Sequence, residues 1–169
     1  EHPLLADASP DAVRRLWLDS PLLDPSQMQS LRSLSAFKVR TFDTTFDVSD
    51  PKNLGARLEE VTGNICDNVA KGDCDIVVVS DLKTSSTRAP IPSLLVIGRV
   101  SLELQKRGLL TKTSVVVETG EAFDVHQITA LCSFGASAVY PYLAYRALDL
   151  VSKNPQAPEN YRHAIEEGV

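Results

Sequence analysis

The sequence is poor in the residues from which metal sites and disulfide frameworks are built. Its 169 residues include three cysteines, Cys66, Cys74 and Cys132, and three scattered histidines. The cysteines form no CxxC pair and their number is odd, so neither a disulfide framework nor a metal site is expected. We predict that they are small, mostly buried hydrophobic residues in a reducing compartment.

The sequence also lacks the common motifs of phosphate binding and nucleophilic hydrolysis, since GxGxxG, GxxxxGK[ST] and GxSxG are all absent. Its 17 Lys and Arg residues are outnumbered by 22 Asp and Glu, and the net charge of -5 argues against a nucleic-acid partner or an anionic membrane surface. No apolar run approaches the roughly twenty residues that span a bilayer, and the first residues do not resemble a signal peptide. We predict a cytoplasmic protein, with an organelle such as a plastid as the alternative.

What is present is the composition of an ordinary globular domain, with 43% hydrophobic and 23% charged residues. The chain is long enough to bury a hydrophobic core. It begins with Glu1, and Met28 is its single methionine, which indicates a piece excised from a longer polypeptide.

Two short apolar runs organise the chain. Residues 76–79 precede Ser80-Asp81, and residues 115–117 precede the segment 118–121, Glu-Thr-Gly-Glu. Both runs are β-branched at every position, which is typical of parallel strands covered on both faces. The apolar segment 90–108 between them predicts a well-buried crossover helix and therefore a right-handed βαβ unit.

The rest of the chain extends this pattern into an α/β domain with a mostly parallel sheet flanked by helices. The further predicted elements are an amphipathic segment with Val13, Leu16 and Trp17, a short helix with Met28, Leu31 and Leu34, a strand over 37–46, a helix over 54–69 with a closely packed Gly63 and an end at Gly72, a polar loop over 82–90, a helix from about Ala122 to Gly135, a strand over 138–140, a helix opened by Pro141, and a last helix from Tyr161. The alternation of strands and helices fits either a doubly wound sheet or a rudimentary, partial TIM-barrel-like arrangement. We divide the chain into an irregular connector with short helices (1–36), the α/β core (37–153) and a linker with the start of a helix (154–169).

Acidic residues follow both buried strands, at the edge where such sheets carry their chemistry. Glu118, Glu121, Asp124 and His126 form the densest polar cluster, which could orient a histidine for proton transfer. The alternative is structural: Glu121 and Asp124 lie in the first turn of a helix, where the dipole favours acids, and His126 lies against the sheet. Asp81 is likewise either a site carboxylate or a turn-forming residue, and we favour the turn.

Two other groups of polar residues are weaker candidates. Lys83 and Arg88 could bind an anion above the sheet, although two basic residues in a loop are usually solvated. Cys132 and Ser133 are possible nucleophiles, but the nearest histidine, His126, lies six positions before Cys132 and on a different side of a helix. A catalytic cysteine–histidine pair is therefore not expected.

Motifs spread over most of the chain resemble one known family. They are Leu18-Asp19-Ser20-Pro21-Leu22-Leu23, Thr41-Phe42-Asp43-Thr44-Thr45-Phe46, the segments 76–81, 89–95 and 118–121, and, most specific, Gly135-Ala136-Ser137-Ala138-Val139-Tyr140-Pro141-Tyr142-Leu143-Ala144. Their order and spacing resemble the C-terminal half of the central domain of the glutamate synthase large subunit. Residues 160–169 resemble the lead-in to its flavin-binding domain. The chain departs from the family's usual residues at Leu82, Ser101, Gln127 and Tyr140.

The resemblance implies that the chain is part of an enzyme that makes glutamate. In that family an amidotransferase domain hydrolyses glutamine, and the ammonia passes inside the protein to a domain that holds FMN and an iron–sulfur cluster. There 2-oxoglutarate is reductively aminated with electrons from NAD(P)H or ferredoxin. The implied partners are these two domains of the same polypeptide and, as a further candidate, a small FAD/NAD(P)H subunit or domain.

We therefore predict a scaffold and ammonia-channel wall that is inactive by itself, with no catalytic, cofactor-binding or metal-binding residue of its own. The candidates for channel or interdomain contacts are Ser80, Asp81, Glu118, Thr119, Glu121 and His126. The alternative is a stand-alone α/β ligand-binding domain or small enzyme that uses the acidic edge of Asp81, Glu118 and Glu121. A third possibility is a decayed paralogue retained for protein interaction.

Overall fold

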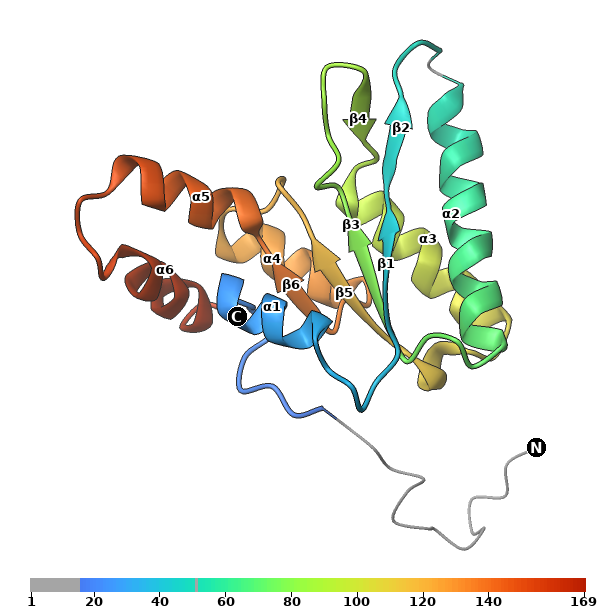
Figure 1. Cartoon of the computed structure of the whole chain (residues 1–169), viewed down its shortest axis with the longest axis horizontal. Helices are drawn as coiled ribbons and strands as arrows, with labels where there is room; N and C mark the ends of the chain where they lie inside the picture. The colour runs from blue at the N-terminus through green and yellow to red at the C-terminus, as the bar shows by residue number, and fades with distance from the viewer. Residues whose placement is uncertain (1–15, 51) are drawn as a thin grey trace, which may run out of the picture.

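A computed structural model describes residues 16–50 and 52–169 of the chain (Figure 1). Four strands form a parallel sheet in the order β1-β3-β5-β6, and two form a small antiparallel sheet, β2-β4. The strands are β1 (Val39–Asp43), β2 (Thr45–Asp47), β3 (Ile76–Ser80), β4 (Arg88–Pro90), β5 (Ser114–Glu118) and β6 (Ala138–Tyr140). The helices are α1 (Pro25–Arg32), α2 (Asn53–Ala70), α3 (Ser93–Lys106), α4 (Val125–Ser133), α5 (Tyr142–Val151) and α6 (Ala157–Glu166), with a 3-10 turn η2 (Leu110–Lys112).

The parallel strands are apolar at every position because both faces of the sheet are covered. Val77 and Val79 belong to a large core cluster shared with α2, α3 and α4. Ile76 and Val78, on the opposite face, pack in a smaller cluster with Leu23 and with Met28 and Leu31 of α1. The predicted α/β class with a mostly parallel sheet flanked by helices is therefore confirmed.

The strand order decides between the two predicted topologies. The four parallel strands follow one another in sequence order, and the crossover helices α2, α3 and α4 all pack on the same face. A doubly wound sheet would place helices of this kind on both faces, so that alternative is wrong. Consecutive βα units with their helices on one side are the arrangement of a partial TIM barrel, with α1 on the face that would be the barrel interior.

The segment before α1 borders the sheet. Leu22 forms a parallel bridge with Val139 of β6. The Val139 N–H donates to the Pro21 carbonyl over 2.7 Å, and the Leu23 N–H donates to the Val139 carbonyl over 2.9 Å. Residues 21–23 thus pair with the outer edge of β6.

The predicted strand over 37–46 is two strands that belong to different sheets. β1 pairs with β3 in parallel, whereas β2, after Thr44, pairs with β4 in antiparallel orientation. The Asp43 carboxylate accepts hydrogen bonds from the Thr45 N–H and hydroxyl at 2.9 and 2.7 Å, which fixes the bend between them. The segment 82–90 therefore includes β4, which leaves no periodic pattern because it has three residues and ends in Pro90.

Other local predictions were confirmed or corrected. α2 is followed by Gly72 with a φ of 69°, the left-handed conformation expected of a C-terminal glycine. Gly63 is not closely packed, since a Cβ there would meet no atom within 4 Å. The start of α3 is less buried than predicted, because Leu94 and Leu95 are exposed.

Two predicted helices begin at other residues than expected. α4 begins at Val125 instead of Ala122 because Asp124 caps it, and α6 begins at Ala157, before Tyr161. In the predicted amphipathic segment near the N-terminus, Trp17 is exposed and not helical, and Val13 lies outside the described residues.

Within residues 16–50 and 52–169, no helix has both the length and the apolarity needed to cross a membrane.

Candidate functional site

The candidate site lies at the carboxyl edge of the parallel sheet, toward which the parallel strand arrows point in Figure 1. The parallel register places Ser80 of β3 opposite Glu118 of β5, and Glu118 opposite Tyr140 of β6. Asp81 and Thr119 follow directly, and both are at least 98% buried. Four of the six predicted candidates therefore meet at this edge because neighbouring parallel strands end together.

Glu118 is held by a cation from a distant helix. Its side chain is 2% exposed, and Oε2 lies 2.7 Å from a guanidinium nitrogen of Arg32, the last residue of α1. The Ser80 hydroxyl donates to the same oxygen. The carboxylate thus links α1 to the ends of β3 and β5, with a partner that compensates its desolvation.

Asp81 is a buried carboxylate that reaches across to the next strand. Its oxygens accept hydrogen bonds from the Thr119 hydroxyl at 2.7 Å and the Gly120 N–H at 3.0 Å, and from the Tyr142 hydroxyl. Burial raises the pKa of Asp81, and these hydrogen bonds oppose the rise only in part. The predicted turn does begin at Asp81, whose backbone carbonyl accepts the Thr84 N–H at 3.0 Å, but the carboxylate takes no part in it and binds the end of β5 instead.

Glu121 serves the start of α3. Its Oε2 accepts the Ser93 N–H at 2.6 Å, and its own N–H donates to the Thr119 hydroxyl oxygen at 3.0 Å. The hydroxyls of Ser93 and Thr119 lie 2.7 Å apart. A carboxylate at the first N–H of a helix satisfies an otherwise free donor and complements the helix dipole. The predicted role of Glu121 as a helix-start acid thus applies to α3, not to α4.

Asp124 and His126 do not join this network. Asp124 caps α4, where it accepts the Gln127 N–H at 2.8 Å in a reciprocal capping box. His126 is exposed in the first turn of α4, not packed against the sheet. Within the described residues, no hydrogen bond or ion pair connects His126 with Glu118 or Glu121. The grouping expected for proton transfer through a histidine is therefore not assembled.

The structure adds Arg32, Ser93, Gly120 and Tyr142 to the network. Ser93 and Tyr142 each follow a proline at the start of a helix, a position that brings them to the strand ends. Gly120 leaves room for Tyr142, since a Cβ at this glycine would lie 2.9 Å from the tyrosine hydroxyl oxygen. Arg32 lies 86 positions from Glu118, and no local pattern connects the two.

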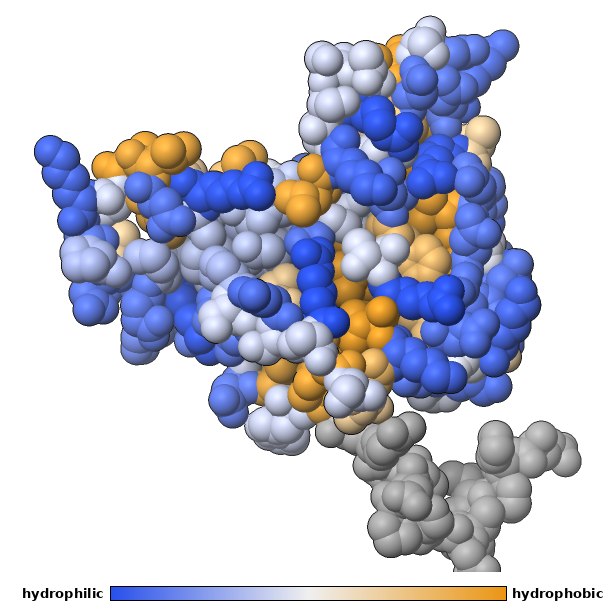
Figure 2. Space-filling model, in the orientation of Figure 1, coloured by the Kyte–Doolittle hydropathy of each residue, from blue (hydrophilic) through white to orange (hydrophobic). Residues whose placement is uncertain are grey.

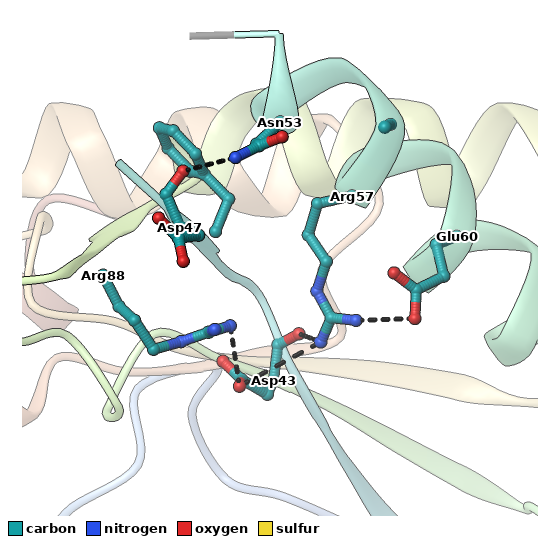
Figure 3. Close-up of a pocket in the computed structure, with 8 residues that line it drawn as sticks. Asp43, Asp47, Asn53, Arg57, Glu60 and Arg88 are labelled. Carbon is teal, nitrogen blue, oxygen red and sulfur yellow. Dashed lines mark hydrogen bonds and ion pairs between the residues drawn. The ribbon is translucent and has the colours of Figure 1, made fainter. Parts of the chain in front are cut away.

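Of the two predicted basic candidates, Lys83 and Arg88, Arg88 lines an open hollow of about 550 Å³ between β2, β4 and α2 (Figure 3). Arg88 donates to the Thr45 hydroxyl at 2.7 Å and reaches Asp43 at 3.4 Å, while the exposed Lys83 lies 3.9 Å from Asp43. Arg57, from the other side, donates to the Asp43 carbonyl at 2.9 Å. Burial alone would raise the pKa of Asp43, but the Thr45 hydrogen bonds together with Arg88 and Lys83 hold it below its usual value. Arg88 is therefore committed to the protein and is not simply solvated.

The cysteines do not offer ligands for a cluster. Cys66 and Cys74 are buried, Cys132 is half-buried, and all three are unpaired. Burial raises the pKa of each thiol, that of Cys74 to about 11, so the thiols are neutral at pH 7. Across the described ranges, no group of three or more His, Cys, Asp or Glu residues is arranged to hold a metal ion.

Comparison with known proteins identifies relatives of this chain. The family model described as "Glutamate synthase central domain" matches residues 1–169. A ferredoxin-dependent glutamate synthase of Pyropia yezoensis is 28% identical over 98% of this chain and 12% of the relative. The glutamate synthase [NADPH] large chain of Bacillus subtilis is 32% identical over 93% of this chain and 11% of the relative. The glutamate synthase [NADH] of Schizosaccharomyces pombe is 30% identical over 98% of this chain and 8% of the relative.

The chain thus spans about a tenth of the length of these relatives. Among solved structures, a mutant flavocytochrome b2 with pyruvate bound is similar with a TM-score of 0.47 and 24% identity, over 63% of this chain and 27% of that one. A similarity at this level carries no inference about function. The match of the family model to every residue does, and by it the chain belongs to the glutamate synthase central domain family.

Proposed function

We propose that this chain is the non-catalytic scaffold and ammonia-channel wall of an enzyme that forms two glutamates from glutamine, 2-oxoglutarate and a reductant. The observation that carries the proposal is the match of the central-domain family to the whole chain. In this proposal the chain lies between an amidotransferase domain and an FMN domain of the same polypeptide. It comprises the connector (1–36), the α/β core (37–153) and the start of a helix toward the FMN domain (154–169).

The state of the carboxylates at the sheet edge supports a scaffold. General acid–base catalysis needs a carboxyl or imidazole group that is free to exchange a proton with a substrate. Here Glu118 is bound by Arg32 and Ser80, and Asp81 by Thr119, Gly120 and Tyr142. Their hydrogen bonds hold β3, β5, α1 and α5 together.

The same arrangement suits a wall for a neutral amine. Ammonia that meets an accessible, protonated carboxyl group would take up its proton and would lose its nucleophilicity. At this edge the carboxylates of Asp81 and Glu118 are covered by donors from the protein, and both residues are buried together with Ser80 and Thr119. The edge is thereby rigid without presenting these carboxylates to a passing solute.

The cofactors implied by the family belong, in this proposal, to another domain. An iron–sulfur cluster is held by several thiolates, whereas the cysteines here are separate and neutral. The described residues therefore do not fit the cluster, and no chemical step is assigned to this chain through it or through FMN.

The test is ammonia accounting in the full-length enzyme. Glutamine-dependent glutamate formation is followed with an external ammonia trap, for the wild type and for Asp81→Asn and Glu118→Gln. The proposal predicts that the trap captures nothing from the wild type and captures ammonia from at least one variant. Asp67→Asn, an exposed acid on α2, is the matched control and should behave as the wild type. Equal coupling in all proteins would remove the channel-wall role and leave a spacer.

A further inference from the structure

The carboxyl edge of the sheet carries exposed apolar side chains next to its buried polar network. They lie in the loops that follow β3 and β5 and in the first turns of α3 and α5, and they are 40–44% exposed: Leu82, Leu94, Phe123 and Leu143. We infer that this apolar rim, defined by these four residues, is the docking surface for the domain that follows this chain in the parent polypeptide. That a domain follows, and that it is the FMN domain, rests on the function proposed above.

Two residues of the apolar rim lie beside Gly120. The Asp81 carboxylate accepts the Gly120 N–H at 3.0 Å, and Leu82 is the residue after Asp81. A Cβ placed on Gly120 would lie 3.6 Å from the Leu143 Cβ. The turn after β5 therefore brings Leu82 and Leu143, which are 61 positions apart in sequence, to one place on the surface.

The other two residues of the apolar rim lie beside Glu121. The Glu121 carboxylate accepts the Ser93 N–H at 2.6 Å, and Leu94 is the residue after Ser93. Phe123 lies two positions after Glu121. Figure 2 shows apolar residues in orange between α5 and the β2–β4 sheet, where the ends of β3 and β5 lie in Figure 1. The four side chains thus gather around residues 120–121.

The apolar rim is supported by backbone that the polar network holds in place. Asp81 and Thr119 are at least 98% buried, and the Thr119 hydroxyl lies 2.7 Å from an Asp81 oxygen and 2.7 Å from the Ser93 hydroxyl. Side chains on a fixed backbone lose little conformational freedom when a partner covers them, which favours association. The apolar rim is therefore preorganised for a partner.

The end of the chain lies close to the apolar rim. A Cβ placed on Gly168 would lie 2.7 Å from Val125, the first residue of α4, which comes two positions after Phe123. Ile165 of α6 is 4% exposed and belongs to the main core, so α6 is fixed to the domain. A polypeptide that continues after Val169 starts beside the apolar rim, and a domain tethered there meets it at high effective concentration.

The margin of the apolar rim is charged, with residues of both signs. Lys83, next to Leu82, is 75% exposed, and Glu121 is also exposed. Arg146 is exposed and lies over the Tyr142 ring, 5.2 Å from its centroid. An apolar centre with a polar margin is typical of protein–protein interfaces. The surface therefore matches a folded protein domain as its partner.

The experiment is photo-cross-linking in the full-length polypeptide. p-Benzoylphenylalanine is placed at the position of Phe123 or, as the matched control, at that of Phe134, which is 53% exposed and follows the other end of α4. Cross-linked peptides are identified by mass spectrometry. We expect the probe at Phe123 to cross-link to residues beyond Val169. The control probe should cross-link within this chain, because the Phe134 ring lies against Gly98 of α3.

Substitutions elsewhere in the apolar rim should loosen the docked domain. Leu82→Ser/Leu143→Ser should lower the cross-link yield of the probe at Phe123 at least about fivefold, as for loss of central apolar contacts in an interface. Leu102→Ser/Leu110→Ser changes two leucines that are equally exposed but outside the apolar rim, and it should leave the yield unchanged. Urea unfolding of both double variants in the 169-residue chain checks that the domain itself stays folded. The probe at Phe123 alone still tests the inference if a double variant unfolds.

Three outcomes would overturn the inference. They are the absence of a cross-link from the probe at Phe123, a cross-link to residues that precede this chain or to a second copy of it, and an unchanged yield in a folded Leu82→Ser/Leu143→Ser variant. A cross-link to a following domain that does not bind FMN would keep the docking surface and refute the FMN domain as its partner. The measurement uses neither glutamate formation nor the ammonia trap, so a loss of the channel-wall role would leave its result intact.

Discussion

Replacing Arg32 by leucine removes the cation that faces a carboxylate with only 2% of its side chain exposed. Breaking a fully buried ion pair costs about 3–5 kcal/mol, whereas an exposed pair contributes about 0–1 kcal/mol. The Arg32 side chain is 41% exposed, so water can approach from its side, and Ser80 still donates to Glu118. We therefore expect Arg32→Leu to lower the free energy of unfolding by about 1.5–3 kcal/mol, between these limits.

The assay is urea unfolding of the chain at pH 7, followed by circular dichroism, with Glu118→Gln and the double variant completing a thermodynamic cycle. Glutamine keeps the shape of the side chain but removes the charge that Arg32 compensates. The double variant should therefore be more stable than the sum of the single losses predicts, with a coupling of about 1–2 kcal/mol. Similar m-values in all variants would show that the unfolding transition itself is unchanged.

Arg107→Leu is the matched control, because Arg107 is 40% exposed, about as much as Arg32, but its partners Asp67 and Glu103 are 60% and 19% exposed, both more than Glu118. Its loss should be a small fraction of that of Arg32→Leu. If the two substitutions destabilise equally, or if the single losses at Arg32 and Glu118 simply add, the ion pair does not hold α1 and the reasoning from burial is refuted.

Three further predictions use the same unfolding assay. Gly120→Ala places a Cβ 2.9 Å from the Tyr142 hydroxyl oxygen and should lower the free energy of unfolding by about 1–3 kcal/mol, as overpacking does in other proteins. Adding Tyr142→Phe should recover part of this loss. An unchanged stability of Gly120→Ala would contradict the close contact. Gly63→Ala adds a methyl group in open space within α2 and should raise the free energy of unfolding by about 0.5–1 kcal/mol; a loss would mean that the site is packed after all. The folded-state pKa of Asp81 is raised above 3.8, so the folded chain holds this proton more tightly than the unfolded chain does. The stability of the wild type relative to Asp81→Asn should therefore fall as the pH rises above about 3.8. A stability difference that stays constant between about pH 4 and pH 7 would contradict the raised pKa.

The elements that the sequence predicted well are those with a local physical cause. Uninterrupted β-branched runs gave β3 and β5, and their common direction brought Ser80, Asp81, Glu118 and Thr119 to one edge. The left-handed glycine after α2 was likewise visible from its position beside a cation at the end of an apolar periodicity. Such features depend on residues that are close together in sequence, so they can be predicted from the sequence alone.

The features that the sequence analysis did not predict depend on residues that are far apart in sequence. Glu121 lies close to α4 in the chain, but its partner is Ser93, 28 positions earlier. Arg32 lies in what reads as an irregular connector, and only the folded chain brings it to Glu118. β4 consists of three residues paired with β2, and a pairing of this length leaves no pattern that distinguishes it from a loop.

The pairing of residues 21–23 with β6 has a consequence for how the domain behaves in solution. An open sheet ends in strands whose free N–H and C=O groups can pair with another molecule, which promotes association and aggregation. At β6 those groups are already used by Pro21 and Leu23, and the chain then turns directly into α1. Residues 21–23 therefore cover the free edge of β6. Neither a further strand nor a second copy of the chain can pair with β6 without first displacing this segment.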